Sequence, residues 1–162
     1  MIVIADATPL NYLVLIGHSD ILSQLFDQVF IPSAVMTELE RPRTPEMVRA
    51  WIAAPPTWLQ VRSVENAKAG DLEHLGAGER EAIFLAEELG AEWLIMDDYD
   101  GRKEATRRNL PVIGTLRVLD EAADRDLINL PEAVRHLQQT TFYVAPDLLR
   151  WLTDRDSTRR KG

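Results

Sequence analysis

The chain has 162 residues, 46% of them hydrophobic, which is enough for one domain with a buried core, and no apolar run approaches the ~18 residues of a membrane span. It contains no cysteine, which excludes disulfides, thiol catalysis and thiolate metal sites and suits a cytoplasmic protein without a signal peptide. The formal net charge of −8 argues against a protein that coats DNA by general attraction, although it does not exclude a nuclease.

Short apolar runs alternate with helical patterns along the chain, which is typical of a mainly parallel sheet flanked by helices. Strands are predicted at 2–5, 29–31, 58–61, 92–96 and 112–114, with a short edge strand at 142–144. Helices are predicted at 8–16, 19–26, 32–39, 45–53, 78–89, 99–108, 115–125, 131–137 and 147–152. The polar stretch 63–77 is predicted to be a loop with room for one helical turn. The pattern predicts an α/β fold with about four to five strands.

Acidic residues stand at the ends of the predicted strands or near the starts of the predicted helices. They are Asp6, Glu38, Glu79, Asp97 and Asp98. In an α/β fold, side chains at the carboxyl ends of neighbouring strands converge on one crevice. Several carboxylates in one crevice repel each other unless a cation lies between them. Mg²⁺ or Mn²⁺ prefers such oxygen ligands, so the pattern predicts metal-assisted phosphoester chemistry.

Two pairs of glutamates leave a choice of site residue. Glu38 and Glu40 are two positions apart on a helix, so their side chains point about 200° apart. Glu38 is favoured because it lies nearer the apolar side of the helix. Glu79 is favoured over Glu81 because Glu79 occupies the first turn of its helix.

Several candidates also have an ordinary structural use. Asp6 could simply cap the first helix, and Thr8 and Thr115 could cap helices rather than support a carboxylate or a metal-bound water. Glu79 also suits a helix N-terminus as a favourable charge. Of the pair that ends the strand at 92–96, one aspartate could bind the metal while the other orients water.

Two basic clusters follow. Arg102, Lys103, Arg107 and Arg108 could hold an RNA backbone or could form a solvated helix face. The basic residues near the C-terminus lead us to expect one domain over residues 1–156 and a disordered tail over 157–162.

The four acidic motifs, taken in order, resemble those of the PIN domain family, most closely its VapC-like branch. The matching segments are residues 6–8 (Asp-Ala-Thr), 35–39 (Val-Met-Thr-Glu-Leu), 75–79 (Leu-Gly-Ala-Gly-Glu) and 94–98 (Leu-Ile-Met-Asp-Asp). The Gly-Glu-Arg-Glu-Ala sequence at 78–82, the paired aspartates and the later Gly-Thr are similar to one PIN-like subgroup. The chain departs from the family pattern in having Glu79 where Asp is usual and Met96 where a hydroxyl is common.

The resemblance implies a PIN-like three-layer α/β/α fold and a metal-dependent endoribonuclease that hydrolyses RNA phosphodiesters. It implies that Asp6, Glu79, Asp98 and Asp97 bind Mg²⁺ or Mn²⁺, with Glu38 as a direct or water-mediated ligand. It further implies that the chain could be the toxin of a type II toxin–antitoxin pair, with an antitoxin partner, and that it forms a homodimer.

Two rival functions remain open on the sequence. The departures at Glu79 and Met96 are compatible with a non-catalytic PIN-like module that binds nucleic acid or protein. A response-regulator receiver or a dehalogenase-like phosphatase fits less well. A receiver needs an acidic pair after the first strand and a dehalogenase-like phosphatase needs Asp-x-Asp there, where this chain has Asp6-Ala7-Thr8.

Overall fold

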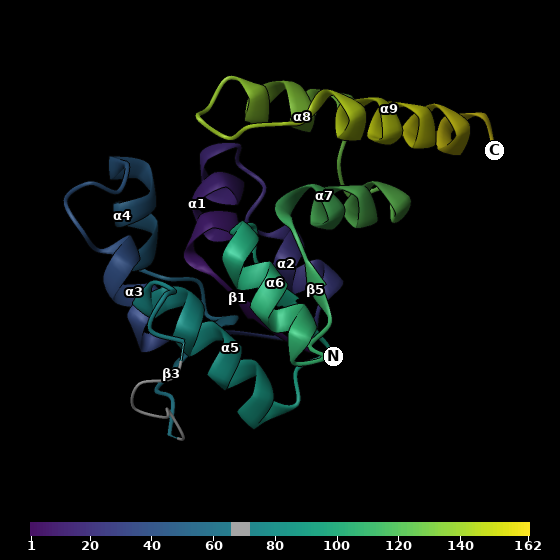
Figure 1. Cartoon of the computed structure of the whole chain (residues 1–162). Coiled ribbons are helices and arrows are strands. Elements are labelled where there is room, and N and C mark those ends of the chain that lie inside the picture. Colours follow the sequence, from purple (N-terminus) through teal and green to yellow (C-terminus); the bar gives the residue numbers. More distant parts are fainter. Residues whose placement is uncertain (66–71) are drawn as a thin grey trace.

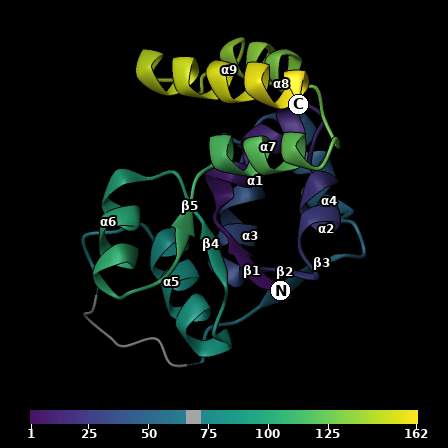
Figure 2. The ribbon, with the colours of Figure 1, turned by 90° about the vertical axis from the view of Figure 1, so that its right-hand side faces the viewer.

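Five parallel strands form one sheet at the centre of the protein. The computed structural model describes residues 1–65 and 72–162. The strands are β1 Ile2–Ala5, β2 Gln28–Pro32, β3 Leu59–Arg62, β4 Trp93–Ile95 and β5 Val112–Ile113. They are hydrogen-bonded in the order β3-β2-β1-β4-β5, which Figure 2 shows across the molecule, and every pair is parallel.

Helices cover both faces of this sheet, which makes three layers (Figure 1). The helices are α1 Ala7–Leu15, α2 Ile21–Leu25, α3 Ser33–Leu39, α4 Glu46–Ala53, α5 Ala77–Leu89, α6 Tyr99–Arg107, α7 Thr115–Asp124, α8 Leu130–Gln138 and α9 Pro146–Lys161. α8 and α9 lie side by side above α7 in both ribbon views. The architecture confirms the predicted α/β/α fold with a mainly parallel sheet. No helix in the described parts of the chain is long and apolar enough to span a membrane.

The side chains of the strands alternate between two cores. Val3 and Ala5 of β1 face the core shared with α1, α2 and α7, whereas Ile4 faces the core shared with α5 and α6. In β4, Ile95 joins the first core and Leu94 the second. Because side chains on a strand alternate and both faces are covered, the strands read as continuous apolar runs.

The order of the strands reverses between β1 and β4. From β1 the chain builds outward to β2 and β3 and then crosses to β4 and β5 on the other side. The covering helices change faces at the same step, as right-handed crossovers require. In such sheets the carboxyl ends of the two diverging strands leave a crevice, which is where ligands bind.

Three sequence-based expectations differ from the structure or lie beyond it. Residues 142–144 form no strand: the N–H of Phe142 donates to the Thr140 hydroxyl at 3.1 Å, and the Phe142 ring packs edge-on against Tyr12. The expected loop at 63–77 includes residues 66–71, which lie outside the described residues. At 157–162, where a disordered tail is expected, the structure continues α9 to Lys161. The extent of the domain, 1–156, stays a prediction.

Ion pairs to α7 explain why α9 is longer than its sequence suggests. Asp120 of α7 is only 1% exposed and accepts hydrogen bonds from Arg155 at 3.0 Å and Arg159 at 2.7 Å. Arg159 also binds Asp124 at 2.7 Å and Asp156 at 2.9 Å. A buried carboxylate needs such partners, so the basic residues that looked like a solvated tail are part of the fold.

Arg159→Gln should therefore destabilise the protein. Arg155 still binds Asp120 in this variant, so the expected loss in the free energy of unfolding is about 2 kcal/mol, less than for a fully broken buried pair. Urea denaturation measures it. Arg150→Gln is the matched control, because Arg150 forms an exposed pair with Asp147 within the same helix. Equal losses in both variants would contradict the role given to Arg159.

Candidate active site

Asp6 lies at the point where the strand order reverses. It follows β1 directly, and its backbone N–H donates to the carbonyl of Ile95, the last residue of β4, at 2.9 Å. The side chain is only 2% exposed, and its Oδ1 has no hydrogen-bond partner among the described residues. A buried carboxylate oxygen without a donor is costly, so Asp6 is the most conspicuous polar feature of the interior.

The surroundings of Asp6 disfavour its charge. Burial, followed by repulsion from Glu79, Glu38 and Asp97, raises the pKa of Asp6 to about 8, although a hydrogen bond from the backbone of Ala7 works in the opposite direction. Carboxylates this close together are typical of a site that expects a cation.

Glu38 lies beside Asp6 across a glycine. A Cβ on Gly78 would lie 3.5 Å from Oδ1 of Asp6 and 3.8 Å from Oε1 of Glu38, so both carboxylates border the same small residue. Burial and then repulsion from Glu79 raise the pKa of Glu38. Glu40, the alternative in the sequence, is exposed.

Glu79 and Asp98 meet at a second glycine. A Cβ on Gly101 would lie 3.4 Å from Oδ2 of Asp98 and 3.6 Å from Cγ of Glu79. Asp98 caps α6, since its Oδ2 accepts from the N–H of Gly101 at 2.8 Å. A Cβ on Gly76 would lie 2.6 Å from Oε2 of Glu79, so this approach also depends on glycine.

The other glutamate of that pair has a different use. Oε1 of Glu81 accepts a hydrogen bond from the N–H of Ala34 at 3.1 Å, in the first turn of α3. This bond ties α5 to the helix that carries Glu38. No sequence pattern indicates this bond, because Ala34 and Glu81 are 47 positions apart in the chain.

Asp97 is held by the turn that starts α7. Its Oδ1 accepts from the N–H of Thr115 at 2.9 Å and its Oδ2 from the Thr115 hydroxyl at 2.6 Å. Burial raises the pKa of Asp97, while the two bonds from Thr115 and the nearby Arg102 lower it. Arg102 itself donates to the carbonyl of Met96 at 3.1 Å, so a cation is fixed beside the acidic site.

The remaining predicted residues lie further from this centre. Thr8 is half-buried in the first turn of α1. Lys103 is exposed on α6. Arg107 and Arg108 bind Glu104 and lower its pKa to about 2, the bond from Arg107 having the largest effect. Of the basic cluster, Arg102 is the member placed next to Asp97.

The donors of this site suit a hard divalent cation. Within residues 1–65 and 72–162, no three Asp, Glu or His side chains already form a metal-binding group. Carboxylates that face one another repel and spread apart, and a cation removes that repulsion. The set consists of carboxylate oxygens, and Oδ1 of Asp6 points among them without a partner, which fits Mg²⁺ or Mn²⁺.

Comparison with known proteins assigns the chain to a family. A model of the PIN domain matches residues 2–156. The chain belongs to the PIN domain family. Among solved structures it is similar to a PilT N-terminus domain protein from the hyperthermophilic archaeon Sulfolobus solfataricus P2, with 15% identity over 90% of this chain and 100% of that one and a TM-score of 0.48. No curated protein matches it.

PIN domains are generally nucleases that use divalent metals, and nucleic acid is their general partner. In this PIN domain the departure at Met96 has a structural explanation. Met96 is fully buried in the second core, and its sulfur packs against Gly101 next to Asp98 and Glu79. The hydroxyl beside Asp97 comes from Thr115 instead.

The raised pKa of Asp6 predicts a stability that depends on pH. A carboxyl group that titrates near 3.8 when unfolded and at about 8 when folded stabilises the fold below pH 3.8, and this contribution is lost as pH rises toward 8. Asp6→Asn removes that loss, so in EDTA at pH 7 the variant should be more stable by roughly 2 kcal/mol.

Urea denaturation at pH 4, 6 and 8 measures this difference, which should shrink to nothing at pH 4. Glu40→Gln, which removes an exposed acid near the site, serves as the control and should show no such trend. If Asp6→Asn is instead less stable than the parent at pH 7, ionising Asp6 lowers the free energy of unfolding very little.

Proposed function

We propose that this PIN domain is a divalent-metal-dependent endoribonuclease that hydrolyses RNA phosphodiesters. The observation that supports it best is Asp6, a buried carboxylate with an unpartnered oxygen at the switch point of the sheet. Glu38, Glu79 and Asp97 surround it closely enough to raise its pKa. A structural role would place a donor on Asp6, whereas a role in binding a cation leaves its oxygen available.

The proposed roles follow from the contacts of each residue. Asp6, Glu79 and Asp98 would hold Mg²⁺ or Mn²⁺, with Glu38 as a direct or water-mediated ligand. When bound, such an ion activates water and stabilises charge on the phosphate. Glu79 reaches the site with one more methylene than Asp, and the close approach at Gly76 and Gly101 accommodates it.

Asp97 and Arg102 have different proposed roles. Both oxygens of Asp97 already accept from Thr115, which favours Asp97 as a group that orients water or ligand rather than as a primary ligand. Arg102 is held by the carbonyl of Met96 and would place positive charge near a phosphate oxygen. Lys103 is exposed and would contact the RNA backbone from α6.

The resemblance to the VapC-like branch supports a more specific biological role than RNA cleavage alone. On that basis we propose a toxin of a type II pair, with an antitoxin as protein partner and a homodimer as the assembly, acting in the cytoplasm. A non-catalytic PIN-like module is the alternative, and the experiment below separates it from the nuclease.

The purified protein should cut RNA only with a divalent metal. A panel of single-stranded and structured RNAs, incubated with Mn²⁺, Mg²⁺ or EDTA and resolved on gels, measures this. Asp6→Asn, Glu79→Gln and Asp98→Asn should each lower the rate by roughly 100-fold or more, since even partners of metal ligands typically cost about 10- to 100-fold. Glu40→Gln is the matched control and should cut normally.

The outcomes separate the two functions. Cutting that needs metal and disappears in all three variants supports the nuclease. Folded protein that binds a divalent ion in calorimetry but cuts no RNA favours the binding module. Cutting that persists in EDTA or in Asp6→Asn would contradict the proposed site.

Thr115 offers a second test. Thr115→Val keeps the size of the side chain but removes the hydroxyl bond to Asp97, so metal-dependent cleavage should fall by about 10- to 100-fold. Thr115→Ser retains the hydroxyl and should restore most of the rate. If valine and serine behave alike, the bond between Thr115 and Asp97 has no part in the reaction.

A further inference from the structure

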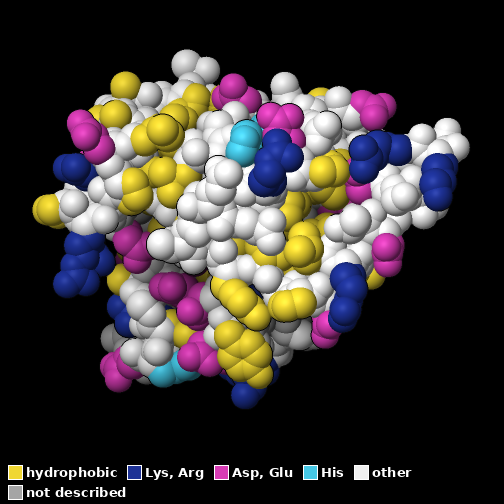
Figure 3. Space-filling model, turned by 90° about the horizontal axis from the view of Figure 1, so that it is seen from above, with side chains coloured by type: hydrophobic (Ala, Val, Ile, Leu, Met, Phe, Trp, Pro, Cys, Tyr) yellow, Lys and Arg dark blue, Asp and Glu magenta, His cyan; other side chains and the backbone are white. Residues whose placement is uncertain are grey.

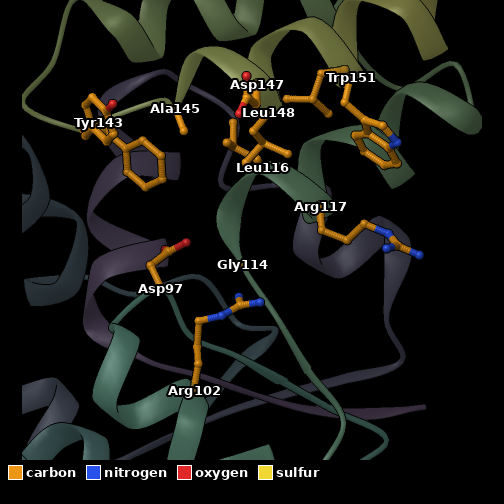
Figure 4. A pocket seen from close by; sticks show the side chains of 12 residues that line it. Asp97, Arg102, Gly114, Leu116, Arg117, Tyr143, Ala145, Asp147, Leu148 and Trp151 are labelled. Carbon is orange, nitrogen blue, oxygen red and sulfur yellow. The ribbon is translucent and has the colours of Figure 1, made fainter.

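A deep groove opens beside the acidic site, between β5 and α9 (Figure 4). Its volume is about 790 Å³. Asp97, Arg102 and Gly114 line it on the side of the acids, and the segment 142–152 lines the opposite side. Because Asp97 belongs to the acidic site and also lines the groove, an RNA strand bound at the acidic site can continue directly into the groove.

Aromatic side chains of the segment 142–152 are exposed where they line this groove. Tyr143 is 78% exposed and Trp151 is 44% exposed. Figure 4 shows their rings at opposite ends of the groove. Seen from the side of α8 and α9, hydrophobic side chains emerge between separated charges (Figure 3). Leu148, 39% exposed, also lines the groove, so its exposed lining on this side is mainly apolar.

The Trp151 ring is held from behind, and the residue next to Tyr143 is packed into the fold. Phe142, next to Tyr143, packs edge-on against Tyr12 of α1 with ring centres 5.1 Å apart. The guanidinium of Arg155 lies 4.9 Å from the ring centre of Trp151, and Arg155 is itself fixed by Asp120. Rings that are already oriented lose little entropy when a planar ligand stacks on them.

The charge of the groove favours an anion. The acids in its lining are engaged: Asp97 by Thr115, and Asp147 by Arg150. Arg102 keeps donors beyond its bond to Met96. Arg117 is exposed, and no carboxylate binds it among the described residues. Positive groups near exposed rings are the combination that binds unpaired nucleic acid.

We propose that this groove is a subsite for unpaired nucleotides of the RNA substrate. Bases stack on Tyr143 and Trp151, while Arg102 and Arg117 hold the phosphates between them. The proposal rests on the proposed function and extends it, because it assigns the nucleotides next to the scissile phosphate to a groove lined by α7 and the segment 142–152. A base inside a duplex is stacked on its neighbours and cannot lie on these rings.

Binding without cleavage tests the subsite separately from the nuclease. The probe is a fluorescein-labelled 12-nucleotide RNA of mixed sequence, compared with the same RNA annealed to its complement. The full chain is titrated in EDTA, so that no cutting occurs, and anisotropy gives the dissociation constant. The single strand should bind more tightly than the duplex.

Substitutions of the rings give the decisive comparison. Tyr143→Ala and Trp151→Ala should each weaken binding of the single strand by about 5- to 100-fold, whereas Tyr143→Phe and Trp151→Phe should bind as the parent does. Arg117→Gln should lower the steepness of the plot of log binding constant against log salt concentration by about one. Arg125→Gln, an exposed arginine of the same helical region outside the groove, is the control.

The outcomes distinguish this proposal from the function on which it rests. Weaker binding in the alanine variants, restored by phenylalanine, supports the subsite even if the protein cuts no RNA. Metal-dependent cutting whose KM is unchanged by both alanine variants overturns the subsite and leaves the nuclease intact. Equal affinity for single strand and duplex, or no binding of either, also overturns it, and recognition of a protein segment would then be the explanation of the exposed rings.

Discussion

The burial of one carboxylate organises this protein. Asp6 follows β1 at the place where the sheet changes direction, so its backbone is fixed by β4 while its side chain enters the crevice between the two strands. Burial and neighbouring acids make its charge unfavourable, and one of its oxygens has no donor among the described residues. The fold therefore holds a group whose ionised form is unfavourable unless a cation lies nearby. The other acids, the glycines between them and the turn that binds Asp97 all gather around that point.

Much of the fold was readable from the sequence because its signals are local. Apolar runs of four or five residues, alternating with helical periods and ended by Gly90 or by prolines, place the strands and helices approximately, except at 142–144 and at the end of α9. The end of α9 was not readable, because the partners of Arg155 and Arg159 lie 35 and 39 positions earlier in the chain. A basic run looks the same whether it faces water or a buried aspartate.

The candidate site was predictable in its residue types and less so in its contacts. The helical period favoured Glu38 over Glu40, and the structure has Glu38 near Asp6 and Glu40 exposed. The roles of Glu81 and of Arg102 depend on which elements become neighbours, so the sequence alone left them undetermined. Gly101 shows the same limit: its close approach to Glu79 follows from the packing of α5 on α6, which no local sequence pattern reveals.

The spread of the acids along the chain has a consequence during synthesis. Asp6 and Glu38 belong to the part of the chain made first, whereas Glu79, Asp98 and the turn at Thr115 follow much later. β4, which pairs directly with β1, comes later in the chain than β2 and β3, which lie on the other side of β1. A fragment that ends before β4 thus carries three of the five acids, Asp6, Glu38 and Glu79, and lacks the strand that borders the other side of the crevice. The complete set of acids, with the turn that binds Asp97, therefore exists only once the chain has been made as far as Thr115.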